Sequence, residues 1–206
     1  MDVDTEEKKP KKKRDKEINK ESVEWVYIQN PIETNYNFEE DGKLIMTAST
    51  STLTENDRPS FLGRRQESAS FYAETEFKLK NLSEDINAGL TVYQINDGHF
   101  DLCVRTTDDN LAVVFRYTIK TLVGEKVVKI KDDSIKRIRL RISSEEEKYF
   151  FEYSIDDGES YIKIDEQAVS LLSTEVVGGF TGVIIGMFVE GDGEAEFRYF
   201  DYQETE

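Results

Sequence analysis

The chain contains one cysteine and one histidine, Cys103 and His99, from which a nucleophilic reaction would have to be built. A thiolate nucleophile requires a base within hydrogen-bonding reach. The two residues lie in the strand-like run HFDLCVR, where their spacing places both side chains on one face but about 13 Å apart. This distance is too long for a nucleophile and its base, so we expect Cys103 to be a small buried side chain. A single cysteine also excludes a disulfide framework and a multi-cysteine metal site within the chain.

A second candidate site is the glycine-rich stretch GGFTGVIIGMF, residues 178–188. Gly178 and Gly179 suit a loop with unusual backbone angles, and the apolar run that follows predicts a strand covered on both faces. Phe180 therefore lies, with Thr181 beside it, where a glycine-flanked loop meets a rigid sheet. Two interpretations remain open. The ring is either a lid on the core or an exposed aromatic that contacts a partner or stacks on a sugar.

The charge of the chain argues against one class of partner. The sequence has 206 residues and a net charge of −16, and residues 22–206 hold 36 acidic against 19 basic residues. Such a domain should repel the phosphates of nucleic acids. No apolar run approaches the ~20 residues that cross a bilayer, and the N-terminus lacks the apolar core of a secretory signal. We expect a cytoplasmic protein that binds neither nucleic acid nor membrane.

Residues 1–21 contain almost no apolar side chains, so we expect a disordered charged tail that ends where a single domain, residues 22–206, begins. Within the tail, the basic cluster KKPKKKR ends in Lys11, Lys12, Lys13 and Arg14. Clusters of this kind are read by nuclear import receptors. The alternative is a solvated tail or a linker, so a nuclear location stays open beside the cytoplasmic one.

From residue 22 onward the chain is expected to be almost entirely strand. Turn signals such as Asp-Gly and Asn-Asp-Gly separate many of the apolar runs. The expected strands are Val23–Ile28, Lys43–Ala48, Phe71–Leu79, Ala88–Ile95, His99–Arg105, Leu111–Ile119, Glu125–Lys131, Ile135–Ser143, Tyr149–Ile155, Tyr161–Ile164, Gly182–Glu190 and Ala195–Tyr202. Residues 169–177 are expected to form a loop.

Several of these strands alternate apolar and polar side chains, which is typical of a sheet with one buried face. The row Arg137, Arg139 and Arg141 opposes three aliphatic residues, so we expect it on a solvent face, paired across strands with glutamates. About twelve such strands with tight turns predict an all-β fold, a two-sheet antiparallel β-sandwich. The only tryptophan, Trp25, is then either buried or a platform for a sugar.

Three passages resemble the C-terminal domain of family 43 glycoside hydrolases, the β-xylosidase and arabinofuranosidase group. They are RPSFLGRRQES (residues 58–68), the hairpin YFFEYSIDDGESYIKI (residues 149–164) with Tyr161 where tryptophan is usual, and the segment from residue 171 to 204 that contains GGFTG. Their order and spacing match over nearly all of the chain after Trp25. The resemblance implies a concanavalin A-like jelly roll, in agreement with the periodicity.

The resemblance also implies where the chemistry of those enzymes is located. Their catalytic carboxylates lie in a five-bladed propeller that precedes the sandwich, and 206 residues leave no room for one. Glycoside hydrolysis needs two carboxylates at a defined separation, and among 43 acidic residues no pair can be singled out. We therefore name no catalytic residue and expect no enzyme. In the family, a loop of the sandwich places an aromatic at the edge of the substrate pocket, a role that would fall to Phe180 here.

No cofactor is expected. Sandwiches of this broad type sometimes bind a structural Ca²⁺ through six to eight oxygens, to which Asp192 and Asp201 could contribute, although acidic turns without metal are commoner. Two functions stay open. The chain is an accessory domain that docks on a propeller or another protein, with contact to a xylan-type oligosaccharide. Alternatively, it is a stand-alone interaction module that kept the fold and lost the link to carbohydrate.

Overall fold

The computed structural model describes residues 17–107, 110–132 and 134–205. The basic cluster at residues 11–14, and with it the prediction of nuclear import, lies outside these residues. The described chain is built of antiparallel strands and three short 3₁₀ turns, η1 (Glu33–Asn35), η2 (Leu79–Asn81) and η3 (Val169–Leu172). In this part of the chain, no helix is long and apolar enough to span a membrane.

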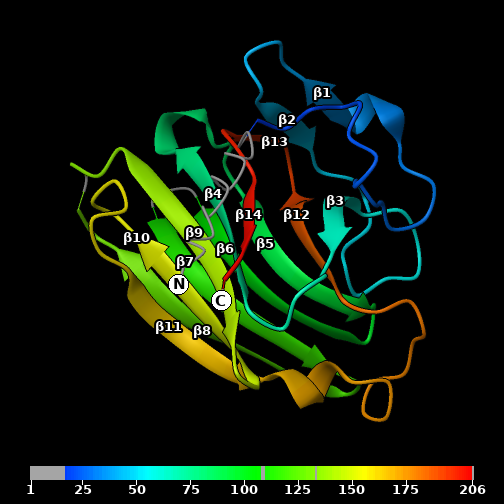
Figure 1. Cartoon of the computed structure of the whole chain (residues 1–206). Coiled ribbons are helices and arrows are strands. Elements are labelled where there is room, and N and C mark those ends of the chain that lie inside the picture. Colours follow the sequence, from blue (N-terminus) through cyan, green and yellow to red (C-terminus); the bar gives the residue numbers. More distant parts are fainter. Residues whose placement is uncertain (1–16, 108–109, 133, 206) are drawn as a thin grey trace, which may run out of the picture.

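Two large sheets lie face to face, and a small third sheet lies at one end (Figure 1). In spatial order the six-stranded sheet contains β3 (Ser60–Arg65), β12 (Ile184–Gly191), β5 (Ile86–Ile95), β6 (Gly98–Thr107), β7 (Asn110–Ile119) and β8 (Leu122–Ile130). The five-stranded sheet contains β11 (Ile162–Ala168), β10 (Lys148–Ser154), β9 (Arg137–Glu145), β4 (Phe71–Lys78) and β14 (Asp201–Glu204). The small sheet contains β1 (Tyr36–Phe38), β2 (Leu44–Thr47) and β13 (Glu194–Phe197). The predicted all-β sandwich is confirmed.

The main core fills the space between the two large sheets. Alternate residues of each strand point into it, as in Phe71, Ala73 and Phe77 of β4 and Tyr149 and Phe151 of β10, all of which are buried. A second apolar cluster lies on the outer face of the six-stranded sheet, where Leu53 and the chain around Val26 and Ile28 cover it. This part of the six-stranded sheet is therefore covered on both faces, whereas β8 at its edge is largely exposed.

Strand β12 has the central place that its apolar run predicts, between β3 and β5. Its glycine, Gly186, lies opposite Gly63 of β3, and the ring of Phe61 rests over both. A Cβ at Gly186 would collide with this ring. The glycine that interrupts the apolar run is therefore needed because the Phe61 ring lies so close to its backbone.

Four expectations about the elements were wrong. The segment Val23–Ile28 is no strand, because it contacts the edge strand β3 only through the bridge between Val26 and Gly63. Strand β3 was missed because it is buried on nearly every position and shows no alternation. The short strand β1 was missed as well. The predicted strand Ala195–Tyr202 is two strands, β13 and β14, because the chain passes there from the small sheet to the five-stranded sheet.

The folded body also begins earlier than the predicted boundary at residue 22. Ile18 is only 2% exposed and belongs to the main core. Its amide donates a hydrogen bond to the carbonyl oxygen of Gly42 at 2.8 Å. One apolar residue among charged neighbours is a weak signal in the sequence, yet it fixes residues 17–21 to the domain.

Candidate functional site

The glycine-flanked loop with Phe180 joins η3 to β12 and is the orange connection between β11 and β12 in Figure 1. Gly178, Gly179 and Gly182 have φ angles of +88°, +85° and +76°, in the left-handed region that favours glycine. Phe180 is 97% exposed. The ring is therefore presented outward, and the interpretation as a lid on the core is wrong.

The base of this loop is held firmly although its tip is exposed. Val177 is fully buried, and its carbonyl oxygen accepts a hydrogen bond from the ammonium group of Lys120. Gln94 donates to the carbonyl oxygen of Gly178 at 3.3 Å, and Arg65 donates to that of Thr181. Side chains from three other strands or turns thus fix the loop on both sides of Phe180. The arrangement presents an aromatic ring whose position is set by the sandwich.

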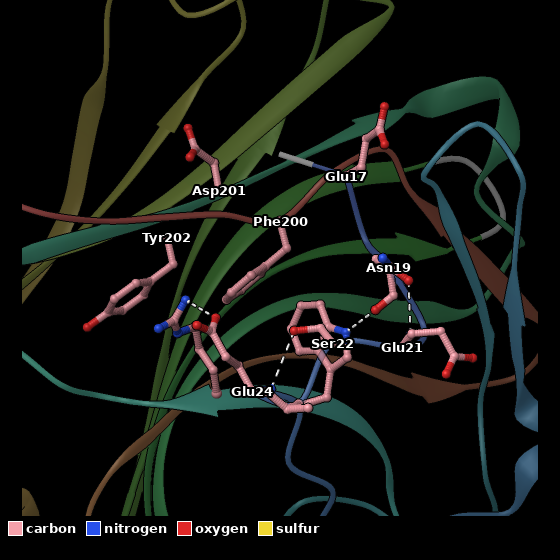
Figure 2. Close-up of a pocket in the computed structure, with 11 residues that line it drawn as sticks. Glu17, Asn19, Glu21, Ser22, Glu24, Phe200, Asp201 and Tyr202 are labelled. Carbon is pink, nitrogen blue, oxygen red and sulfur yellow. Dashed lines mark hydrogen bonds and ion pairs between the residues drawn. The ribbon is translucent and has the colours of Figure 1, made fainter. Parts of the chain in front are cut away.

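A pocket of about 460 Å³ surrounds Trp25 at another part of the surface (Figure 2). Trp25 is half-buried, its indole N–H donates to the carbonyl oxygen of Asn19 at 2.6 Å, and its ring meets Phe200 edge-on. The guanidinium group of Arg64 lies 4.3 Å from the ring centre of Tyr202. Trp25 therefore packs against the domain with its polar atom satisfied, which is intermediate between the buried and platform interpretations.

The row of arginines on β9 faces outward and pairs with glutamates of β4, as predicted. Arg141 lies opposite Glu74 and Arg139 opposite Glu76, with nitrogen–oxygen distances of 2.7 and 2.8 Å. The glutamates are not in open solvent, however, because Glu74 and Glu76 are 2% and 1% exposed. The expectation of a solvated face is corrected to a covered polar layer.

Tyrosines close this layer from the outside. The hydroxyl groups of Tyr161 and Tyr199 both donate to Glu74, the latter at 2.6 Å. Burial alone would raise the pKa of Glu74, but the hydrogen bonds from the two tyrosines and Arg141 outweigh burial and lower the pKa. Both carboxylate oxygens of Glu74 are thus occupied. This carboxylate cannot serve as a proton acceptor at neutral pH without losing its partners.

The outer face of the six-stranded sheet carries a polar group that the sequence did not single out. The carboxylate of buried Asp101 contacts His99 Nδ1 at 2.9 Å and accepts a hydrogen bond from Arg116 Nε at 3.1 Å. Arg116 Nη1 donates to Glu190 Oε2 at 2.8 Å, and the amide of Leu53 donates to the other oxygen at 2.9 Å. Burial would raise the pKa of Asp101, but its interactions with His99 and Arg116 lower it to about 2.

Cys103 lies on the same strand and is fully buried, as predicted. Burial raises the pKa of its thiol to about 12, so the thiol is protonated at neutral pH and a poor nucleophile. His99 contacts Asp101 through Nδ1, and no hydrogen bond to Cys103 is seen among the described residues. The alternation of His99, Asp101 and Cys103 along one strand is the signal that could have revealed the polar group.

The acidic residues proposed for calcium lie in a turn and at the start of β14. Asp192 is exposed, whereas Asp201 is 3% exposed and accepts a hydrogen bond from Gln203 at 3.0 Å. Among the described residues, no group of three or more His, Cys, Asp and Glu side chains could hold a metal ion. The calcium site stays a prediction.

The two packed antiparallel sheets, with the exposed loop between η3 and β12, define a two-sheet β-sandwich. The chain belongs to the family of β-xylosidase C-terminal concanavalin A-like domains, whose model matches residues 17–203. It is 30% identical over 187 residues to a non-reducing end α-L-arabinofuranosidase of Bacteroides ovatus, covering 88% of this chain and 35% of the relative. It is 33% identical over 171 residues to a β-xylosidase of Bacillus subtilis, covering 75% of this chain and 30% of the relative.

Solved structures agree with this assignment. A glycoside hydrolase of the Bacteroides ovatus xyloglucan locus superimposes with a TM-score of 0.81 at 27% identity, over 93% of this chain and 38% of that one. A Saccharomyces cerevisiae protein described as functionally unknown has the same fold, with a TM-score of 0.61 at 14% identity. That superposition covers 88% of this chain and 96% of the yeast chain. The chain spans about a third of the length of the curated enzymes, and the match is to their C-terminal domain alone.

Proposed function

We propose that this chain is a non-catalytic accessory domain that docks on the catalytic part of a carbohydrate-active enzyme. In this role the loop of Gly178, Gly179, Phe180 and Thr181 places an aromatic ring at the edge of the partner's sugar pocket. The observation that carries the proposal is the ring of Phe180, 97% exposed on a loop whose base is anchored from both sides. Aromatic side chains are enriched at protein interaction sites.

The family supports the same role. The relatives are named as an arabinofuranosidase and a β-xylosidase, and this chain corresponds to their C-terminal domain. The buried carboxylates of Glu74 and Asp101 lie on two different sheets, and each is held by arginine, tyrosine or histidine and is not free to act across a sugar. We therefore propose that the chain alone does not hydrolyse glycosides. It would contact a xylan-type oligosaccharide while docked on its catalytic partner.

A chimaera tests this role. This sandwich would replace the matching segment of the Bacteroides ovatus arabinofuranosidase, and the activity on an aryl arabinofuranoside would be measured. Phe180→Ala should lower kcat/KM by about tenfold, the scale of one lost apolar contact in a pocket. Val23→Ala is the matched control, because Val23 is 99% exposed and lies on a different surface. An equal loss in both variants, or none in either, would refute the role of Phe180.

A second candidate function is a stand-alone interaction module. The yeast structure favours it, because there the same fold makes up 96% of a chain. In this case the chain acts in the cytoplasm, or in the nucleus through Lys11, Lys12, Lys13 and Arg14. Replacement of these four residues by alanine in a fluorescent fusion tests the import signal. Nuclear accumulation that persists in the variant would refute the role of these residues as an import signal.

A further inference from the structure

A pocket of about 380 Å³ opens on the outer face of the six-stranded sheet. Its floor is the polar group formed by His99, Asp101, Arg116 and Glu190, and its volume is within the range of small-molecule sites. The residues at its walls come from β7, β8 and the chain after β2, and they include Thr52, Thr54, Thr118, Val123 and Glu125. Thr118 lies directly opposite His99 in the sheet, and Val123 lies opposite Thr118.

One of the residues that line this pocket has a buried atom without a hydrogen-bond partner within the protein. His99 is 2% exposed, and its Nε2 is unpaired. Its Nδ1 faces the carboxylate of Asp101, which can only accept, so Nδ1 carries the proton. In the neutral ring Nε2 is then an acceptor. A buried polar atom without a partner is costly, and a ligand hydroxyl that reaches Nε2 from the pocket would satisfy it.

The charges of the floor select the chemistry of that ligand. The floor contains two carboxylates, those of Asp101 and Glu190, and one guanidinium group, that of Arg116. The excess of negative charge disfavours an anionic ligand. A cation is also disfavoured, because all four oxygens of these carboxylates already accept hydrogen bonds from His99, Arg116 or Leu53. The ligand must be neutral and must bring a hydrogen-bond donor to Nε2. Threonine hydroxyls at the walls can both donate and accept.

We infer that this pocket binds a neutral polyol of the size of a monosaccharide, with one hydroxyl donating to His99 Nε2. The site is distinct from the Phe180 loop, although both adjoin the turn between β5 and β6. On one side of that turn Gln94 holds the loop, and on the other Asn96 donates to the carbonyl oxygen of Thr54 at the pocket wall, at 3.4 Å. Binding here does not depend on the docking role of Phe180.

Because His99 is the only histidine of the chain, its ring gives a single set of NMR signals that reports on the pocket. The full chain would be titrated separately with D-xylose, L-arabinose and D-glucose, with sodium acetate and zinc chloride as charged probes. At least one sugar should shift the Nε2 and Cε1–H signals of His99 saturably. The absence of a saturable shift with all three sugars at high millimolar concentration would overturn the inference, as would a shift with zinc alone.

Two wall variants locate the binding. Val123 is 63% exposed, so Val123→Trp should fold normally and block the pocket mouth, abolishing the shift. Thr118→Val keeps the shape of the side chain and should weaken binding by about tenfold, as expected for one lost hydrogen bond. Unchanged affinity in both variants would place the sugar elsewhere and refute the site.

Phe180→Ala separates this inference from the proposed function. This variant should bind the sugar with wild-type affinity, since the ring is outside the pocket lining. If Phe180→Ala abolishes the His99 shift, the inference fails as stated. If instead the shift is retained while the arabinofuranosidase chimaera is insensitive to Phe180→Ala, the docking role fails and the pocket stands.

Discussion

The outer faces of the two large sheets both carry buried carboxylates, yet they are completed in different ways. On the five-stranded sheet, Glu74 is closed by Arg141 and by the hydroxyl groups of Tyr161 and Tyr199. On the six-stranded sheet, Asp101 is held by His99 and Arg116 beneath a pocket, and Nε2 of His99 is left unpaired. The difference is between a closed network and one with an open position.

This difference teaches how to distinguish a structural ion-pair layer from a binding site in the same fold. Both layers show alternate polar residues along a strand, Glu74 and Glu76 in β4 and His99 and Asp101 in β6. Burial and lowered carboxyl pKa values are also common to Glu74 and Asp101. The pocket above the unpaired His99 Nε2 separates the second layer from the first, in which Arg198 Nε is also unpaired.

The largest effect is expected from breaking the closed network. Glu74→Ala leaves Arg141 and the hydroxyls of two half-buried tyrosines without this acceptor. The free energy of unfolding should fall by about 3 kcal/mol, the scale of a buried ion pair that loses one member. Urea denaturation would measure it, and Glu74→Gln, which keeps the shape of the side chain, should lose less. A loss below about 1 kcal/mol, the scale of an exposed pair, would show that this layer is not closed.

A smaller, pH-dependent effect is expected for Asp101. The folded-state pKa of about 2 is lower than the ordinary aspartate pKa of 3.8, so this carboxylate stabilises the fold above pH 3.8. The contribution is about 2 kcal/mol, and it should be lost as the pH falls from about 4 to about 2. Asp101→Asn should therefore differ from the wild type in unfolding free energy at pH 6 but approach it near pH 2. A difference that is constant over this range would contradict the ionised state of Asp101.

The smallest effect is expected at the loop that neither network touches. Phe180→Ala should change the free energy of unfolding by no more than about 0.5 kcal/mol, because the ring is exposed. Phe188→Ala is the matched control, since Phe188 is fully buried and its loss should cost about 3 to 5 kcal/mol. Thermal denaturation of both variants gives the comparison. Equal destabilisation would mean that Phe180 belongs to the core after all.

The sequence predicts much of the sandwich because half-buried strands alternate, as β4, β9 and β10 do. It misses β3, which is buried on both faces and has no period. It also treats the outer face of β9 as solvated, because the tyrosine that covers it, Tyr199, lies 125 residues from Glu74 in the chain. Contacts between distant segments leave no local pattern.

The candidate sites show the same limit. The glycines at 178 and 179 predict a loop, but its outward direction depends on Arg65, Gln94 and Lys120, which are distant in sequence. The pocket above His99 depends on the segment around Leu53 that covers the sheet. Local spacing identified the loop and the buried cysteine, whereas the unpaired nitrogen required the packed structure.

The most direct test of the contrast between the two faces is a map of backbone amide shifts of the full chain with a bound monosaccharide. The account predicts that the perturbed amides gather on β6, β7 and β8 around His99, Thr118 and Val123, while those of β4 and β9 around Glu74 and Arg141 stay unchanged. Perturbations centred on β4 and β9, or on neither face, would contradict it.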